Sequence, residues 1–490
     1  MKTTHDLVVI GGGAAGLTAA GFGASLGAST VMIERERLGG DCTWTGCIPS
    51  KTLLKAARVA HQAANASHYG LADTPVPVDF AALMRHVRGV REHVYEEADA
   101  PPVFEALGVD VRLGRARFVD AHTVEVTAES GAVERVSGTK IVIATGARPA
   151  VPDIPGLDAT PFLTSDTLFE ITDQPRHLAI LGGGPIGVEM AQAFRRLGSE
   201  VTLVEHGGRI LKQDDPELAG MLCSVLGAEG VRFRLRTDVV RAERDGAGVA
   251  LTLREDGREA RLAADALLVA VGRQPNVAGL GLDAAGVTYS GDGIAVDARG
   301  RTNVRHIYAA GDVTGQYALT HMSEHTAKTA VGNALLRLRS TVDADHVPWA
   351  TYTDPELAHV GATAAGLDAA GTRYRTYRFP YGKLDRAITD GETTGLIAIH
   401  ATRGGRILGA SVLGARAGDL IGELAVAMRT GVSMRALSDT VHPYPTYGLG
   451  VRRAADQWYV GLRSARLVGT VKALFRFRGS VTGYRPGEVV

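Results

Sequence analysis

The amino-acid sequence predicts an α/β protein built from several domains. The chain has 490 residues, which is too long for a single hydrophobic core and suggests roughly three domains. An apolar strand, a glycine-rich loop and a helix of small residues follow one another near the N-terminus, and the same succession returns near residue 180. Because this unit builds Rossmann-like nucleotide-binding domains, its repetition predicts two such domains in one chain.

The composition is that of an ordinary globular protein, with 45% hydrophobic and 22% charged residues. Lys+Arg and Asp+Glu number 53 each, so no net field attracts nucleic acid or an anionic membrane. No uninterrupted apolar run reaches the roughly 18 residues of a membrane-spanning helix. Three cysteines are too few for a disulfide-stapled secreted scaffold. We therefore expect a cytoplasmic protein that does not bind nucleic acid.

The first unit begins with the strand Asp6–Ile10 and continues into a helix that ends near Ser25. Between them lie three glycines at dinucleotide-loop spacing: Gly11, Gly13 and Gly16. In such a loop the first glycine makes the tight turn, the second lets backbone N–H groups approach a pyrophosphate, and the third allows close helix–strand packing. The next strand, Ser29–Ile33, is followed by Glu34, which can accept hydrogen bonds from ribose hydroxyls.

The second unit repeats every part of the first. Its strand is Leu178–Leu181, and the next strand, Glu200–Val204, is followed by Glu205. Its glycines are Gly182, Gly184 and Gly187. One such loop alone is weak evidence, but two copies with their acids predict two bound nucleotides. A carboxylate at Glu205 accepts from a free ribose 2′-OH and repels a 2′-phosphate, which favours NADH over NADPH, although His206 and Arg209 could weaken this discrimination.

Cys42 and Cys47 lie between the two units. Their spacing does not suit a zinc ribbon, since no second cysteine pair exists, and no resident metal is expected. It suits a redox disulfide at the start of a helix, where Pro49 fits the first turn and a thiolate has a lowered pKa. Lys51 follows Cys47 by one helical turn and lies on the same side. The alternative of two buried structural cysteines is less consistent with the flanking glycines. Cys223, in an apolar helical pattern, is expected to be a packed core thiol.

With these parts in order, the sequence resembles the pyridine nucleotide–disulfide oxidoreductases, the class I flavoprotein disulfide reductases, up to about residue 460. Residues 144–149, which include Thr145 and Gly146, resemble the crossover from an FAD domain to an NAD domain. Residues 271–276, which include Gly272, resemble the return crossover, and Asp312 ends a segment similar to the second FAD motif. Residues 351–356 resemble the start of the C-terminal dimerisation domain.

The resemblance implies the domain organisation of a homodimeric flavoprotein. The expected boundaries are an FAD-binding domain at 1–149 and 275–345, an NAD(P)-binding domain at 150–274, an α+β dimerisation domain at 346–465 and a basic extension at 466–490. In the implied mechanism, NADH reduces FAD and the flavin reduces the Cys42–Cys47 disulfide. Cys47 is the flavin-facing thiolate, and Cys42 is the interchange thiol. Lys51 resembles the lysine beside flavin N5, with Glu189 as its ion-pair partner.

One segment departs from the usual family pattern, in which a histidine is the acid/base and a glutamate orients it. Tyr444 occupies the position of the histidine, and Leu449 that of the glutamate. A phenol with a pKa near 10 is a poor base at neutral pH, although it can donate a hydrogen bond or bind a metal ion. His442 could substitute, but it lies two residues earlier, where the family does not carry the base.

The identity of the electron acceptor therefore stays open among three hypotheses. The first is a small-molecule disulfide or another thiol-reactive acceptor. The second is a metal ion, because a tyrosine in this position resembles mercuric reductases and soft thiolates suit soft metals. Mercuric reductases generally carry a C-terminal cysteine pair, whereas no cysteine follows Cys223 here, so metal delivery would need another route. The third is a redox sensor or electron-carrier subunit that does not turn over.

The extension from Arg466 to Val490 holds five basic residues and one acidic residue, a net charge of +4. Its apolar residues are spaced for one helical face: Leu467, Val468, Val471, Leu474 and Phe475. We expect a helix packed on its own dimer rather than an anchor on a membrane surface.

Overall fold

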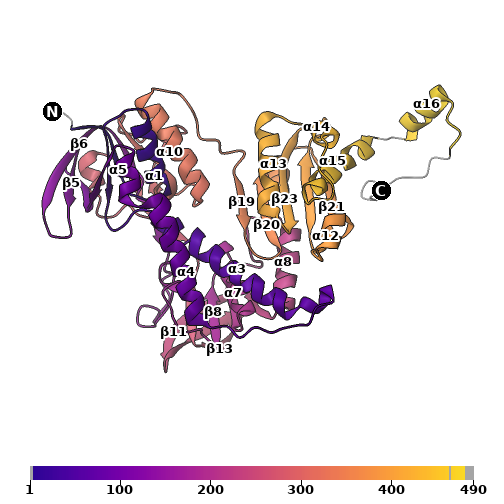
Figure 1. Cartoon of the computed structure of the whole chain (residues 1–490), viewed down its shortest axis with the longest axis horizontal. Helices are drawn as coiled ribbons and strands as arrows, with labels where there is room; N and C mark the ends of the chain where they lie inside the picture. Colours follow the sequence, from indigo (N-terminus) through magenta and orange to yellow (C-terminus); the bar gives the residue numbers. More distant parts are fainter. Residues whose placement is uncertain (1–3, 463–464, 480–490) are drawn as a thin grey trace.

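The structure is a computed structural model that describes residues 4–462 and 465–479. Three α/β regions follow one another, and the last helix stands apart from them (Figure 1). The first region contains a sheet with the order β3-β2-β1-β6-β5-β4, in which β18 also pairs with β6. Its strands are β1 (His5–Ile10), β2 (Thr30–Glu34), β3 (Val109–Leu113), β4 (Arg115–Phe118), β5 (Thr123–Thr127), β6 (Val133–Ile143) and β18 (Ile307–Ala309).

The pairs of β1 with β2 and β6, of β2 with β3, and of β6 with β18 are parallel. The apolar residues of β1 are buried on both faces of the sheet, as is typical of parallel sheets covered by helices. Two of these helices pack on each other: α1 (Ala14–Ser25) and α10 (Thr320–Leu335). Because β18 and α10 follow the second region in sequence, the chain leaves this domain and returns to it.

The second region is a parallel sheet with the order β10-β9-β8-β14. Its elements are β8 (His177–Leu181), α7 (Pro185–Arg196), β9 (Glu200–Glu205), α8 (Pro216–Ala228), β10 (Val231–Leu235) and β14 (Ala266–Val269). An antiparallel sheet precedes β14: β11 (Thr237–Asp245), β12 (Gly248–Glu255) and β13 (Arg258–Ala264). The chain enters and leaves this domain along an antiparallel pair, β7 (Ala147–Pro149) and β15 (Arg273–Pro275).

The third region is a five-stranded antiparallel sheet with the order β19-β20-β23-β22-β21. Its strands are β19 (Pro348–Thr351), β20 (Glu356–Gly361), β21 (Arg375–Pro380), β22 (Leu396–Ala401) and β23 (Ile407–Gly414). Its main helices are α13 (Ala417–Thr430), α14 (Met434–Asp439) and α15 (Gly448–Leu462). The expected fold class, two Rossmann-like domains and a C-terminal α+β domain, is confirmed.

Two helices of the first region extend along the second: α3 (Cys47–Ala64) and α4 (Phe80–Val94). Leu53 and Phe80 belong to one buried cluster with Phe194 of α7 and Leu357 of β20. The rings of Phe80 and Phe194 lie 6.0 Å apart, centroid to centroid. The three regions thus share a hydrophobic core, which limits how far the domains can move relative to one another. Cys223 is half-buried against this core, and burial raises the pKa of its thiol.

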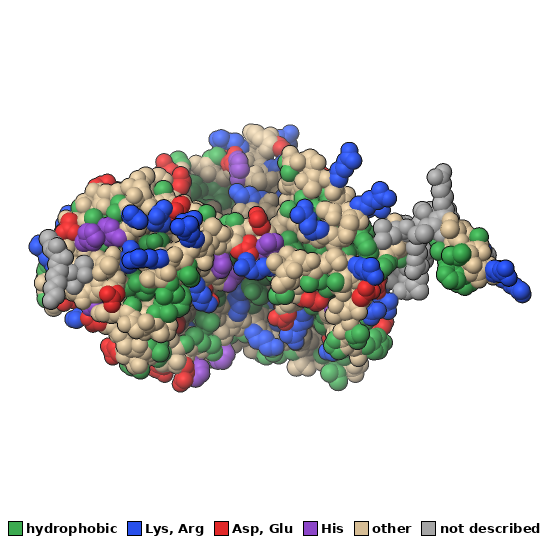
Figure 2. Space-filling view, turned by 90° about the horizontal axis from the view of Figure 1, so that it is seen from above, with side chains coloured by type: hydrophobic (Ala, Val, Ile, Leu, Met, Phe, Trp, Pro, Cys, Tyr) green, Lys and Arg blue, Asp and Glu red, His purple; other side chains and the backbone are tan. Residues whose placement is uncertain are grey.

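Helix α16 (Ala465–Phe475) forms as expected in the basic extension. It stands away from the body, and hydrophobic side chains cover part of its visible face (Figure 2). Leu474 is 73% exposed and Phe475 62% exposed. Packing of this face on a partner subunit stays a prediction, and residues 480–490 of the extension lie outside the described part. Among the described residues, no helix is long and apolar enough to cross a membrane.

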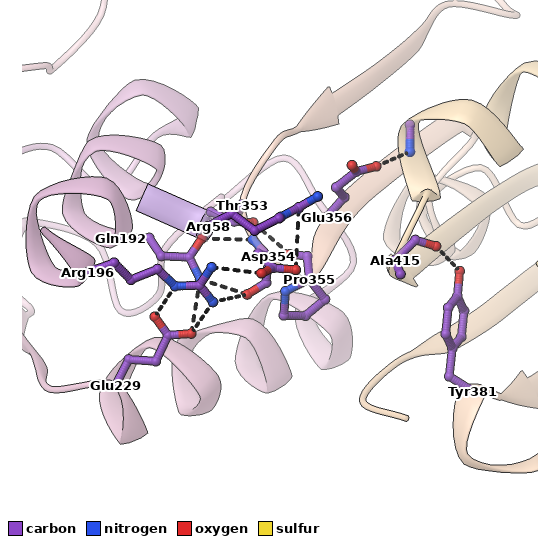
Figure 3. Close-up of polar contacts among 11 residues, drawn as sticks. Arg58, Gln192, Arg196, Glu229, Thr353, Asp354, Pro355, Glu356, Tyr381 and Ala415 are labelled. Carbon is purple, nitrogen blue, oxygen red and sulfur yellow. Dashed lines mark hydrogen bonds and ion pairs between the residues drawn. The ribbon is translucent and has the colours of Figure 1, made fainter. Parts of the chain in front are cut away.

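A buried polar cluster joins the three regions at the C-terminal end of α7 (Figure 3). Arg196 donates to Glu229 at 2.7 Å and to the carboxylate of Asp354 at 2.7 Å. Gln192 holds the backbone of Asp354 from both sides, accepting from its N–H at 2.8 Å and donating to its carbonyl at 2.7 Å. Arg58 of α3 lies 3.3 Å from the same carboxylate. The chain segment before β20 is therefore tied to both α7 and α3.

Replacing Arg196 should destabilise the protein, because its side chain is only 5% exposed and its loss removes the ion-pair partner of Glu229 and leaves Asp354 with Arg58 alone. We expect Arg196→Leu to cost about 3–5 kcal/mol, the usual effect of removing one member of a buried ion pair, and to lower the midpoint of thermal unfolding. Arg232→Leu is the matched control, since the Arg232–Glu200 pair is largely exposed and should contribute less than about 1 kcal/mol. Equal shifts for both variants would contradict this account of the junction.

Candidate active site

A cavity of about 1630 Å³ runs between the first and second regions and ends near β19. Many of the residues singled out from the sequence line it: Gly11, Gly13, Glu34, Cys42, Cys47, Lys51, Thr145, Gly146, Glu189 and Asp312. Other candidates do not line it: Gly16, Gly182, Gly184, Gly187, Glu205, Gly272, His442 and Tyr444. The structure therefore brings the cysteine pair and the first glycine loop into one cavity. The second loop reaches this cavity through Pro185 and Ile186, and neither His442 nor Tyr444 lines it.

The first glycine loop is shaped by backbone that leaves no room for side chains. Gly11 has a φ of +108°, and a Cβ there would lie 2.3 Å from the carbonyl oxygen of Ala144. A Cβ on Gly16 would lie 1.8 Å from the carbonyl oxygen of Gly11, so α1 can approach β1 only with glycine here. At the end of β2, Glu34 accepts from the N–H of Gly12 at 2.7 Å. This cradle fits the nucleotide half of an FAD.

The second glycine loop has the same construction. Gly182 has a φ of +111°, and a Cβ on Gly187 would lie 2.0 Å from the carbonyl oxygen of Gly182. A Cβ on Gly184 would meet nothing within 4 Å, which leaves the N-terminus of α7 open to a ligand. Glu205 accepts from the N–H of Gly183 at 2.6 Å, as Glu34 does in the first loop. The loop fits a second dinucleotide.

The two crossovers lie side by side. The hydroxyl of Thr145 donates to the carbonyl of Asn276 at 2.8 Å, and the N–H of Asn276 donates to the carbonyl of Gly146 at 2.9 Å. Arg273 forms ion pairs with Asp312, at 3.3 Å, and with Asp41. Burial raises the pKa of Asp312, and the charge of Arg273 opposes this effect. The guanidinium thus connects the crossover, the second FAD motif and the turn that carries the cysteines.

The cysteine pair lies at the junction of two helices. Cys42 is in α2 (Gly40–Trp44), and α3 begins at Cys47. The pKa of Cys47 is lowered by the hydrogen bond from Cys42, by the hydrogen bond from Thr320 and by the positive charge of Lys51. Burial acts in the opposite direction and raises it. The pKa of Cys42 is raised by the hydrogen bond to Cys47 and by burial. The two thiols are thus inequivalent, with Cys47 favoured as the thiolate.

Thr320 is a site residue that sequence reasoning missed. Its Oγ1 lies 3.4 Å from Sγ of Cys47, and it is the first residue of α10. No local signal pointed to it, because 273 residues separate it from Cys47 in the chain. It can donate a hydrogen bond to the thiolate.

Hydrogen bonds to several other parts of the chain hold the segment between the two cysteines. The hydroxyl of Thr43 donates to Asp99 at 2.5 Å. The indole N–H of Trp44 donates to the carbonyl of Leu38 at 2.7 Å, and Arg91 donates to the carbonyl of Trp44 at 3.0 Å. The turn can therefore hold its shape whether the sulfurs are bonded to each other or not.

Lys51 lies one turn beyond Cys47, between a carboxylate and an aromatic ring. Its Nζ is 2.7 Å from Glu189 and 4.6 Å from the ring centroid of Tyr352. The other oxygen of Glu189 accepts from the N–H of Tyr352 at 2.9 Å. Glu189 is only 6% exposed, and Lys51 supplies its countercharge. Tyr352 also lines the cavity, a role that its position before β20 did not indicate.

The C-terminal segment lies on the surface of the third region. Tyr444 is 69% exposed, and its interaction with Asp385 raises its pKa. Leu449 is buried in the core of that region. His442 contacts acceptors with both ring nitrogens, the carbonyl of Thr440 at 3.0 Å and Glu423 at 2.9 Å. Contacts on both ring nitrogens hold the imidazole in place, so the surroundings of His442 favour an anchoring role over that of a base.

Family models and known proteins match this chain over most of its length. The pyridine nucleotide-disulphide oxidoreductase family model matches residues 5–331, and the family's dimerisation-domain model matches residues 347–455. Mercuric reductase of Streptomyces lividans is 36% identical, over 93% of this chain and 96% of that protein. Dihydrolipoyl dehydrogenase of Chlamydia muridarum is 33% identical, over 91% and 95% respectively.

Solved structures of flavoprotein disulfide reductases and related proteins have a similar fold. The Cu(II) complex of the HOCl-induced flavoprotein disulfide reductase RclA from Escherichia coli has a TM-score of 0.82 at 30% identity and covers 93% of this chain and 99% of that one. LpdA from Mycobacterium tuberculosis has a TM-score of 0.85 at 28% identity, with 92% and 99% covered. The chain, with its dimerisation domain and its paired nucleotide-binding loops, therefore belongs to the pyridine nucleotide-disulphide oxidoreductases, homodimeric enzymes that use FAD and a pyridine nucleotide.

Proposed function

We propose that this enzyme oxidises NADH and passes the electrons through Cys42 and Cys47 to a soft, thiol-binding metal ion. The observation that carries the proposal is Tyr444, an exposed phenol where disulfide-reducing members of the family carry an imidazole base. Its pKa is raised, so the phenol stays protonated at neutral pH and cannot take up a proton from a thiol. A metal ion needs no such base, since it displaces the proton of a thiol as it binds.

The residues around the cysteines have defined roles in this proposal. The first glycine loop, Glu34 and Asp312 would hold FAD, which would supply the two-electron chemistry between the nicotinamide and the disulfide. Lys51 and Thr320 stabilise the thiolate of Cys47, and Glu189 holds Lys51 in place through an ion pair of 2.7 Å. Cys42 remains a thiol until an acceptor binds its sulfur. Thiolate sulfur prefers soft metal ions over hard ones.

The relatives support a metal ion as the acceptor. Several are named mercuric reductases, and one structural neighbour was solved as a Cu(II) complex. In a homodimer of this family, the C-terminal segment of one subunit completes the active site of the other. We therefore assign Tyr444 of the partner subunit to the acceptor side of Cys42, where its hydroxyl can hydrogen-bond a thiolate or bind the metal.

The second glycine loop supports NADH as the donor. Glu205 lies at the strand end where a ribose 2′-OH would bind, and a 2′-phosphate would meet its negative charge. The Arg236 side chain lies beside Gly208, whereas the two cations singled out from the sequence are already engaged. His206 pairs with Asp238. Arg209 donates to backbone carbonyls of the following turn, at Leu211, Lys212 and Asp214. Neither is free to compensate a phosphate.

We expect a higher kcat/KM for NADH than for NADPH, with the difference reduced in Glu205→Ser because the variant no longer repels the 2′-phosphate. Initial rates with both cofactors and one fixed acceptor measure this. Asp238→Asn is a useful comparison, since it releases His206 and should improve NADPH use only slightly. A preference of the wild-type enzyme for NADPH would overturn the assignment of Glu205.

Two-electron reduction of the holoenzyme should produce a long-wavelength charge-transfer band from the Cys47 thiolate to FAD. Cys47→Ser should abolish the band, and Cys42→Ser should retain it. Because the pKa of Cys47 is lowered, the band should persist at neutral pH and fade as the pH falls through that pKa. Lys51→Met removes the nearby cation and should raise the pH at which half of the charge-transfer band is lost by about one unit. Lys55→Met, one turn further along α3, is the control for Lys51→Met. If the Cys42→Ser and Cys47→Ser variants behave identically, the roles assigned to the two cysteines are wrong.

With NADH as donor, the wild-type enzyme should reduce Hg(II) or Cu(II) faster than lipoamide or glutathione disulfide. Tyr444→His should raise turnover of the small disulfides by at least tenfold, below the full range of about 10²–10⁴-fold for general acid–base catalysis, because no acid orients the new imidazole. Leu449→Glu is not a suitable companion change, since Leu449 is buried and an unpaired carboxylate there would destabilise the domain.

Tyr444→Phe is the control for the imidazole. It should lower turnover of the metal ion without any gain on disulfides, because the ring remains and only the hydroxyl is lost. If the wild-type enzyme reduces lipoamide or glutathione disulfide as fast as it reduces the metal ions, the proposed acceptor class is wrong.

A further inference from the structure

We propose that Tyr352 is a positioning residue for NADH oxidation, whose ring holds the ammonium group of Lys51 where the nicotinamide meets the flavin. This rests on the proposed path from NADH to FAD and on the position of Lys51 beside the flavin, which the family resemblance implies. It does not depend on the electron acceptor. Tyr352 lies between β19 and β20, so the third region contributes to the nicotinamide side of the site in its own chain.

The ammonium group of Lys51 is held between a carboxylate and an aromatic ring. Its Nζ lies 2.7 Å from Glu189 and 4.6 Å from the ring centroid of Tyr352, a distance at which the face of a ring attracts a cation. Glu189 also accepts from the backbone N–H of Tyr352 at 2.9 Å, so the carboxylate is tied to the residue that carries the ring. The two contacts together restrain a long side chain that is flexible by itself.

This contact lies on the side of the cavity that the second dinucleotide would enter. Helix α7 begins at Pro185, and Glu189 follows one turn later. The N-terminus of α7 is suited to a pyrophosphate. The large cavity is lined here by Pro185, Ile186, Glu189, Lys51 and Tyr352. We therefore place the nicotinamide beside Lys51.

Lys51 and Tyr352 also line a second, smaller cavity of about 130 Å³, which contains a competing carboxylate. Glu356 lines this cavity but not the large one. Its carboxylate accepts from the N–H of Gly418 at 2.8 Å and has no ion-pair partner within the described residues. Burial raises the pKa of Glu356, and the bond from Gly418 opposes this effect; a nearby ammonium group would favour the ionised form. The cavity's other carboxylate, Asp354, already has two arginine partners. The ring of Tyr352 thus keeps Lys51 from turning towards Glu356.

The ring of Tyr352, and not its hydroxyl, makes the contact with Lys51. Within the described part of the chain, the hydroxyl has no hydrogen-bond partner. Burial is the main cause that raises its pKa, so the phenol is neutral at neutral pH. A Cβ on Gly418 would lie 3.2 Å from Cε1 of the ring, so the start of α13 packs closely against it. Removal of the hydroxyl alone should therefore leave Lys51 in place.

The position of Lys51 matters for hydride transfer. When NADH is oxidised, the C4–H bond of the nicotinamide breaks, and the hydride moves with both electrons to N5 of the flavin, where negative charge develops. A cation that is already fixed beside this position stabilises the charge without any rearrangement. An ammonium group shared between two cavities is in place for only part of the time. Tyr352 thus acts through Lys51 on the rate of flavin reduction and not on the affinity for NADH.

The test measures reduction of the flavin by NADH in the absence of any acceptor. The FAD-loaded enzyme is mixed with NADH in a stopped-flow instrument, and the loss of flavin absorbance gives the limiting rate and the NADH concentration at half that rate. Tyr352→Leu should lower the limiting rate by about threefold to thirtyfold, the range expected for a lost cation–π contact, and should leave the half-saturating concentration unchanged. Tyr352→Phe keeps the ring and is the matched control, with the rate of the wild type.

A second substitution and a structural readout separate the position of Lys51 from a general effect on folding. Glu356→Gln can still accept from Gly418 but removes the competing charge; alone it should change nothing, and combined with Tyr352→Leu it should restore most of the lost rate. Crystal structures of the FAD-loaded variants give the distance from Nζ of Lys51 to Glu189. It should stay near 2.7 Å in Tyr352→Phe, whereas in Tyr352→Leu the Nζ should occupy more than one position.

An unchanged rate or an unmoved Nζ in Tyr352→Leu, an equal loss in Tyr352→Phe, or no recovery with Glu356→Gln overturns the proposal. If Tyr352→Leu does not fold, Tyr352→Met takes its place, because it fills similar space without a ring. Failure of NADH to reduce the flavin of the wild-type enzyme would instead contradict the proposed function. Because no acceptor enters this assay, its outcome is independent of whether a metal ion receives the electrons.

Discussion

The carboxylate of Glu189 is the contact on which the arrangement of the active site depends. One oxygen accepts from Lys51 on α3 and the other from the backbone of Tyr352 before β20. A single buried side chain of the second region thus holds a catalytic helix of the first and the start of the third. Gln192 and Arg196 continue the same face of α7 at helical spacing and secure Asp354. The buried charges of this cluster are tolerated because each charged group forms a hydrogen bond or an ion pair with another member of the cluster.

The inequivalence of the two cysteines follows from their surroundings. Cys47 begins a helix and faces a hydroxyl and a cation, all of which stabilise a negative sulfur. Cys42 lies in the short helix α2, and its pKa is raised first by the hydrogen bond to Cys47 and then by burial. A chain in which both sulfurs were thiolates would place two adjacent negative charges in a half-buried space. The fold avoids this by placing the charge of Lys51 on the side of Cys47.

The third region lines the cavity of its own chain through Tyr352, and in the proposed mechanism its C-terminal segment acts at the active site of the partner subunit. Tyr444 does not line the cavity of its own chain, and His442 is held by Thr440 and Glu423 on the surface of that region. A site divided between subunits lets the acceptor side vary while the flavin side keeps its geometry, since the two are built by different parts of the chain. Proteins with this architecture accordingly share one electron path and differ in what receives the electrons.

The local pattern of the sequence determined the two nucleotide-binding units, the helix start at Cys47 and the helix in the C-terminal extension. These features depend on contacts between near neighbours: the steric demand for glycine at Gly11 and Gly182, the periodicity of apolar residues, and the acid at each strand end. The pairing of Lys51 with Glu189 came from family resemblance, not from the pattern. Thr320, Tyr352 and Asp99 gave no signal, because each meets the cysteine turn or Lys51 from a distant part of the chain. Only tertiary packing decides such contacts, since a side chain acquires a role when the fold sets its neighbours, its burial and its countercharge.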